Sequence, residues 1–194
     1  MAEDPNMLAN QEQKMSPQQA TSWLQRTLGI TPEITQSVID ITEAGRAVVG
    51  RVTEDAILLS ELAPVGVEYH EAWHRVSQLL ISEKKRNKLY NRYRAKYNSD
   101  LTDAQIDEIY AEDFRRFQLE EAQNYDFESK NWFRRIIDFI RLWANTGSYA
   151  LANIYTDINR AKYNGVIPDP ANVARFKRIY ANSGPNLEVN GYRF

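Results

Sequence analysis

The chain contains no cysteine and only two histidines among its 194 residues. The absence of cysteine excludes disulfide bonds, thiolate nucleophiles and every structural zinc site built from cysteine. Any zinc ion would therefore have to be held by histidine and carboxylate side chains.

The sequence also lacks a strong excess of charge and any long apolar run. Its 24 basic and 26 acidic residues give a net charge of −2, so no global field favours nucleic acid or an acidic membrane. Residues 1–15 are polar and have no apolar centre, and no later run reaches membrane-spanning length. We therefore expect no signal peptide, no membrane partner and a cytoplasmic location.

Both histidines fall in one five-residue window, His70-Glu71-Ala72-Trp73-His74. On a helix this spacing places the two imidazoles on one face, about one turn apart, where both can bind one tetrahedral metal. Glu71 lies about 100° further round the helix, where a carboxylate can act on a water at the metal without binding the metal itself. The alternative is an ordinary helix whose histidines contact the core and whose glutamate is solvated.

Hydrophobic periodicity predicts one domain, 16–182, between a flexible leader, 1–15, and an irregular tail, 183–194. Ser16-Pro17 is typical of a helix start, and the helix should run to about Leu28. Between residues 33 and 60, short apolar runs separated by turn residues predict two or three strands. Further helices are expected at about 65–81, 83–97, 102–121, 130–145, 148–162 and 170–181. Strands followed by many helices indicate an α+β fold, with a small N-terminal sheet packed on a helix-rich region.

A catalytic zinc site needs a third protein ligand, which here must be Asp or Glu. The helix expected at 102–121 carries several carboxylates, of which Glu108 and Glu112 are four residues apart and share a face. Phe114 and Phe117 mark the buried side near that face. Two buried carboxylates are costly unless a positive charge lies close to them, and a zinc ion would supply it.

The two segments together resemble the glutamate-type zincins, which are zinc metalloproteases. The segment from Glu108 to Arg115 is similar to the corresponding helix of anthrax lethal factor and to the thermolysin pattern. The resemblance implies that Glu108 is the third zinc ligand and that Glu112 holds a ligand histidine, His70, through its other ring nitrogen. Glu112 as the ligand itself remains the alternative.

A second resemblance, over roughly residues 20–165, is to zincin domains embedded in very large bacteriophage and mobile-element proteins. It rests on the order of an apolar extended segment, the zinc motif, the Ala111-Glu112 helix, and the later segments 132–137 and 154–163. It implies a zincin-like fold, Zn²⁺ as cofactor, and peptide hydrolysis with Glu71 as general base. Protein or peptide substrates, other virion proteins as partners, and a virion-associated location are the corresponding expectations.

The same family implies how substrate binds. The strand before the zinc helix is an edge strand that pairs with extended substrate, and the matching segment is Ala56, Ile57, Leu58 and Leu59. An ordinary core strand is the alternative. Lethal factor has a catalytic tyrosine seven residues before its zinc glutamate, but this chain has Leu101 there. The oxyanion donor is therefore unassigned, with Tyr110 and Tyr97 as candidates.

Two other functions compete with peptide hydrolysis. One is a virion structural or cargo protein that keeps the zincin fold without hydrolysing anything. The other is a single-stranded nucleic-acid module, because residues 84–97 interleave lysine and arginine with Tyr90, Tyr93 and Tyr97. The helical spacing of these tyrosines instead favours a buried stripe with the cations facing water.

Overall fold

The computed structural model describes residues 14–37, 39–41, 47–48, 50–53, 55–124 and 149–182. The predicted leader up to residue 13, the helix expected at 130–145 and the tail 183–194 lie outside these described residues. The described part is α+β, as the sequence predicted. Within it, no helix is long and apolar enough to cross a membrane.

The first helix, α1 (Pro17–Leu28), begins and ends where the sequence predicted. The Ser16 side chain accepts a hydrogen bond from the Gln19 amide, proline occupies the first turn, and Gly29 ends the helix in the left-handed conformation. Leu24 and Leu28 face the core. The predicted leader is too long by two residues, because Lys14 forms an antiparallel bridge with Pro64 and Met15 is buried.

The His-Glu-x-x-His segment lies on α2 (Val67–Arg75), which continues without a break into a π-helical segment, η2 (Val76–Leu80). The helix expected at 65–81 is thus confirmed in extent, but its last turn is wider than an α-helix. The Ile81 amide closes this turn with a 3.0 Å bond to the Val76 carbonyl, five residues back.

The remaining helices agree with their predicted ranges. They are α3 (Glu83–Tyr97), α4 (Asp103–Asn124), α6 (Tyr149–Asn159) and α7 (Pro170–Asn182). Ser82 caps α3 as expected. At the start of α4, Thr102 and Gln105 form a reciprocal capping box: the Thr102 amide donates to Gln105 Oε1 at 2.9 Å, and the Gln105 amide to Thr102 Oγ1 at 3.3 Å.

The strands are shorter and more numerous than the sequence indicated. A mixed sheet contains β1 (Glu33–Thr35), β4 (Gly50–Val52) and β5 (Ile57–Ser60), in the order β1-β5-β4. β1 runs parallel to β5, and β4 runs antiparallel to it. A separate antiparallel pair joins β2 (Asp40–Ile41) and β3 (Ala47–Val48).

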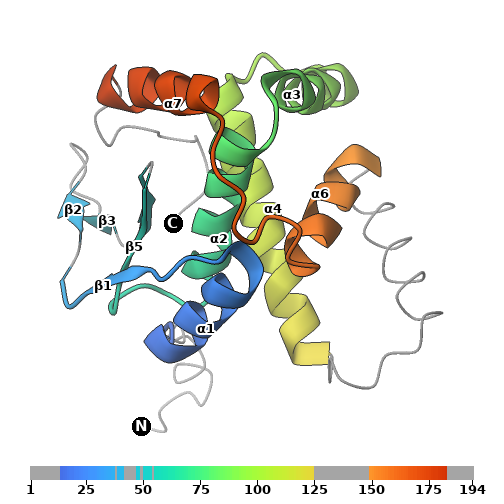
Figure 1. Ribbon diagram of the computed structural model, residues 1–194. Coiled ribbons are helices and arrows are strands. Elements are labelled where there is room, and N and C mark those ends of the chain that lie inside the picture. The colour runs from blue at the N-terminus through green and yellow to red at the C-terminus, as the bar shows by residue number, and fades with distance from the viewer. Residues whose placement is uncertain are drawn as a thin grey trace, which may run out of the picture.

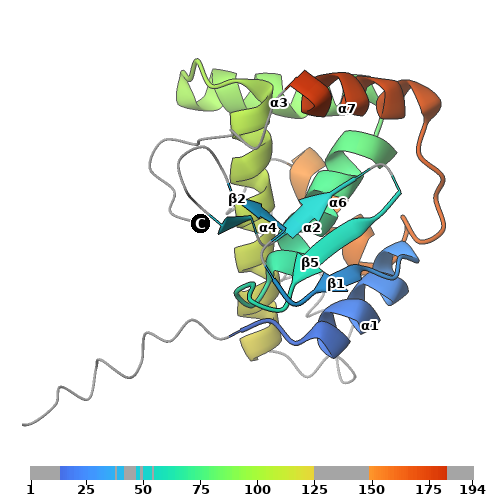
Figure 2. The same ribbon diagram turned by 90° about the vertical axis from the view of Figure 1, so that its left-hand side faces the viewer.

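The helices α2 and α4 run through the centre of the molecule, with the sheet on one side and α6 on the other (Figure 1). In both views α3 and α7 lie across one end of this central pair (Figure 2). The core fills the space between the layers, and Trp73, Phe114 and Tyr155 are fully buried at its middle. The His-Glu-x-x-His segment is therefore held between a sheet and a second helix.

Candidate metal centre

His70, His74 and Glu108 come together where α2 meets α4. Their ligand atoms all lie within 4.8 Å of one another, which is the arrangement a single metal ion requires. The Nε2 atoms of the two histidines are 3.0 Å apart. Oε2 of Glu108 lies 3.2 Å from His70 Nε2, and Oε1 lies 3.2 Å from His74 Nε2.

These separations match the edges of a small coordination polyhedron. Zinc bonds of about 2.0–2.1 Å at tetrahedral angles place ligand atoms about 3.3 Å from one another. The observed spacings of 3.0 and 3.2 Å are close to that value. Two imidazole nitrogens and one carboxylate are also donors that zinc accepts. The three side chains therefore fit a zinc ion without moving their helices.

The imidazoles and the carboxylates of the cluster shift the pKa values of His74 and Glu108. Burial would lower the pKa of His74, but the carboxylates of Glu108 and Asp107 outweigh burial and raise it well above its ordinary value. Burial would likewise raise the pKa of Glu108, but the two histidines lower it. A cation bound between the three side chains would compete with protons for the same ring nitrogens and carboxylate oxygens.

Asp107 is a site residue that the sequence reasoning missed. Its Oδ2 accepts a 2.9 Å hydrogen bond from Nδ1 of His74, which leaves the lone pair on His74 Nε2 for a metal. The carboxylate is 2 % exposed, so its bonds are made away from solvent. The only sequence signal was its place next to Glu108.

The structure corrects the role predicted for Glu112. Its carboxylate is buried and accepts bonds from Arg115 and Arg116, at 3.4 and 3.2 Å, rather than holding a ligand histidine. Glu112 lies one helical turn further along α4 than Glu108. At that turn its partners are the two arginines and not the imidazoles. The alternative in which Glu112 is the third ligand fails for the same reason.

Glu71 lies beside the cluster and under the sheet. Burial raises the pKa of its carboxyl, while the nearby His70 and His74 oppose that rise. A Cβ added at Gly50 would lie 2.5 Å from Oε1 of Glu71 and 2.7 Å from Cγ2 of Val67. The backbone of β4 thus passes directly over Glu71, and only glycine leaves room for it.

The predicted substrate strand is not an edge strand. Ile57, Leu58 and Leu59 belong to β5, whose two sides pair with β1 and β4, and Ala56 precedes it. An incoming peptide cannot pair with a strand whose backbone groups are already bonded on both sides. The core-strand alternative is therefore correct, and among the described residues β1 and β4 are the two edge strands of this sheet.

Neither candidate for the oxyanion donor occupies a suitable place. The hydroxyl of Tyr110 donates to the Leu89 carbonyl at 3.3 Å, and its ring packs edge-on against Trp73. Tyr97 is half exposed at the end of α3, and its ring lies tilted against that of Tyr93. The part of the chain that the structure describes leaves the donor unassigned.

The tyrosines of α3 form the stripe that their spacing predicted, except at its last position. Tyr90 is buried and Tyr93 packs partly against the core, whereas Tyr97 is exposed. Lys84, Lys88 and Arg92 face solvent. The aromatic side chains of this helix are thus largely used for packing and not for stacking on bases.

Comparison with known proteins found no matching family model, no matching curated protein and no matching solved structure. The functional argument therefore rests on the geometry of the site.

Proposed function

We propose that this domain is a zinc-dependent endopeptidase of the zincin type. The observation that carries the proposal is the convergence of His70, His74 and Glu108 around one point, with the buried Glu71 beside them. The residues come from two helices, and their donor atoms are spaced as a tetrahedral zinc site requires. His70, His74 and Glu108 would hold the ion, and when bound it would supply Lewis acidity and a water of lowered pKa.

The protein groups around the site have separate tasks in this proposal. Glu71 takes a proton from the attacking water and returns it to the leaving amine. Asp107 keeps Nδ1 of His74 protonated and fixes the orientation of the ring. The backbone of β4 at Gly50 confines the Glu71 carboxylate between the strand and α2.

Protein or peptide substrates fit the sheet that covers the site. β4 is one of the two edge strands of the mixed sheet, and of these two it is the one that carries the glycine beside Glu71. An extended peptide that pairs with this edge would bring its backbone beside the candidate general base. The resemblance to zincin domains of bacteriophage proteins supports virion or host proteins as substrates and partners.

The deciding experiment compares the parent chain with Glu71→Gln. The amide keeps the size of the side chain and removes its basicity, so zinc content and fold should be retained. Peptide cleavage should fall by about 10² to 10⁴, the loss typical of a missing general base. An unstructured protein pool would be incubated with each variant, and cleavage products would be identified by mass spectrometry.

His74→Ala serves as the control that loses metal as well as activity. Cleavage that needs both zinc and Glu71 supports the proposal. A zinc-loaded parent that cuts neither the pool nor any longer natural precursor would contradict it. A domain that binds zinc for structure alone, as in a virion scaffold, would then be the better account.

A further inference from the structure

We propose that Gln78 and Arg175 are positioning residues that fix Asp107, and through it the imidazole of His74, so that the C-terminal helix α7 sets the metal affinity of the site. This inference rests on the zinc site proposed above. It concerns residues outside the zinc motif, one on η2 and one on α7.

The carboxylate of Asp107 is surrounded by five hydrogen-bond donors. Oδ1 accepts from Trp73 Nε1 at 3.0 Å and from the Tyr90 hydroxyl at 2.9 Å. Oδ2 accepts from His74 Nδ1 at 2.9 Å, Ser77 Oγ at 3.1 Å and Gln78 Nε2 at 2.6 Å. The bond from Gln78 is the shortest of the five, and it is made on the oxygen that also holds His74. Loss of this donor would leave Oδ2 free to shift away from the imidazole.

The amide of Gln78 can adopt only one orientation between its neighbours. Its Nε2 must face Asp107, because a carboxylate only accepts hydrogen bonds. Its Oε1 then faces Arg175, whose Nη2 donates to it at 2.6 Å, and a guanidinium only donates. Rotation of the amide by 180° would break both contacts. Asp107 and Arg175 thus impose the same orientation on Gln78, and loss of Arg175 would remove one of the two contacts that fix it.

Arg175 is held in place because α7 docks on the C-terminal end of η2. Asn172 donates to the carbonyls of Leu79 and Ile81 at 3.2 and 3.0 Å, and Arg175 donates to the Gln78 carbonyl at 3.1 Å. From the α3 side, the buried Arg86 donates to the Ser77 carbonyl at 3.0 Å. These side chains satisfy carbonyls that the end of a helix leaves without partners. The docking of α7 on η2 thus places the Arg175 side chain, which in turn helps to orient the Gln78 amide.

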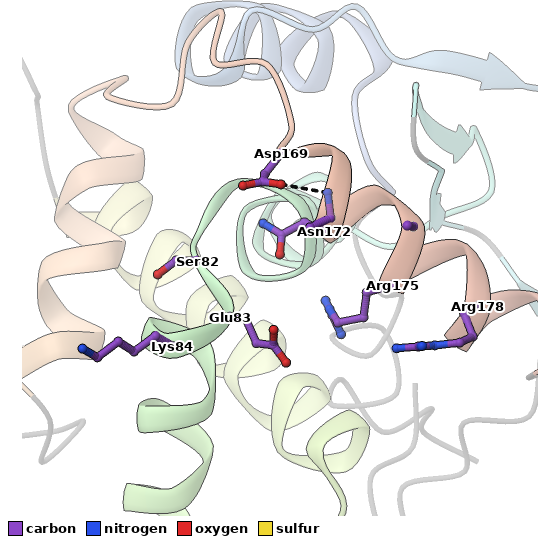
Figure 3. A pocket seen from close by; sticks show the side chains of 9 residues that line it. Ser82, Glu83, Lys84, Asp169, Asn172, Arg175 and Arg178 are labelled. Carbon is purple, nitrogen blue, oxygen red and sulfur yellow. Dashed lines mark hydrogen bonds between the residues drawn. The ribbon is translucent and has the colours of Figure 1, made fainter.

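The surface next to this arrangement offers a matched control. A pocket between the first turn of α3 and the first half of α7 is lined by Arg175 and Arg178, with Glu83 across from Arg175 (Figure 3). Arg178 is exposed, and it lies on the same helix and lines the same pocket. The structure gives it no bond to Gln78. Arg178→Met therefore removes the same charge without touching the network.

The test measures zinc affinity of the full chain by competition with a chromophoric chelator. Removal of a residue that orients a metal ligand costs about 10- to 100-fold in affinity. We expect Gln78→Met to lower affinity about tenfold, and Arg175→Met about three- to tenfold, while Arg178→Met stays within about twofold of the parent. The visible spectrum of bound Co²⁺ should change in the first two variants and not in the third, because the geometry of His74 changes.

The double variant separates positioning from simple destabilisation. If Arg175 acts through Gln78, then Arg175→Met should have no further effect on affinity in the Gln78→Met background. Arg175→Lys, which keeps one charged donor, should recover part of the affinity if Arg175→Met unfolds too easily to measure.

Equal zinc affinities in the parent, Gln78→Met and Arg175→Met would overturn this proposal alone. Losses of zinc affinity that multiply in the double variant would also overturn it, because they would show that Arg175 and Gln78 act independently. A parent chain that binds no zinc would overturn the proposed function together with it.

Discussion

At the scale of single residues, three carboxylates of α4 differ sharply in what they touch. Glu108 faces both imidazoles, Asp107 accepts from Nδ1 of His74, and Glu112 accepts from Arg115 and Arg116. Adjacent residues of a helix point about 100° apart, so neighbouring carboxylates can contact different groups. Their order in the sequence does not show which group each carboxylate contacts. Their contacts predict three different effects on metal binding.

We expect Glu108→Gln to lose zinc first under mild chelation, because it removes a ligand. Asp107→Asn should weaken zinc binding by about 10- to 100-fold, since it removes the negative charge beside His74 and replaces one of the two acceptor oxygens with an NH2 donor. Glu112→Gln should bind zinc nearly as the parent does. Zinc retained during dialysis against graded chelator, measured by elemental analysis, gives the order.

Histidine variants provide the control for that series. His70→Ala and His74→Ala should bind little zinc under conditions in which the parent is near equimolar. Zinc loss from Glu112→Gln ahead of Glu108→Gln would reassign the ligand and contradict the geometry described above.

At the scale of elements, the close approach of β4 to α2 limits where the carboxylate of Glu71, the candidate general base, can lie. Gly50→Ala would put a methyl group 2.5 Å from Oε1 of Glu71, so either the carboxylate or the strand must move. We expect peptide cleavage to fall by about tenfold or more, but by no more than the loss of about 10² to 10⁴ that removal of a general base causes. Zinc affinity should change little, because the three atoms nearest to the added methyl group belong to Glu71 and Val67 and not to His70, His74 or Glu108. Steady-state cleavage and chelator competition measure the two effects.

If Gly50→Ala lost zinc affinity and cleavage together, the substitution would have displaced the three ligands as well as Glu71. An unchanged rate of cleavage would mean that Glu71 is not the base.

At the scale of the whole molecule, the site connects two helices that are distant in sequence. A metal that binds both α2 and α4 in the folded state, but not in the unfolded chain, must stabilise the fold. With free zinc at about 100 times the dissociation constant, the gain is about 2.7 kcal/mol. For a domain of this size we expect the unfolding temperature to rise by about 5–10 °C. Thermal unfolding followed by circular dichroism, with and without zinc, measures it.

The same scan on His74→Ala identifies the source of the effect. The zinc-dependent rise should disappear in this variant. A rise of equal size in His74→Ala would show that zinc acts elsewhere on the molecule.

The sequence by itself determined most of the helices and the composition of the site. Helix starts are set by neighbouring residues, and Ser16, Ser82 and the pair Thr102 and Gln105 form the caps that their types predict. The spacing of His70 and His74 on one face follows from helix geometry alone. The absence of cysteine left carboxylates as the remaining ligands, and Glu108 was among those expected.

Only the tertiary structure decided which elements meet. Periodicity gives the faces of one helix, but the packing of α4 on α2 decides that Asp107 and not Glu112 supports a ligand histidine. The order of strands depends on pairing between distant segments, so β5 became central and β4 became the edge against Glu71. The bonds from Arg175 through Gln78 to Asp107 join three segments that no local pattern connects. These features depend on long-range contacts, and short-range propensities carry no information about them.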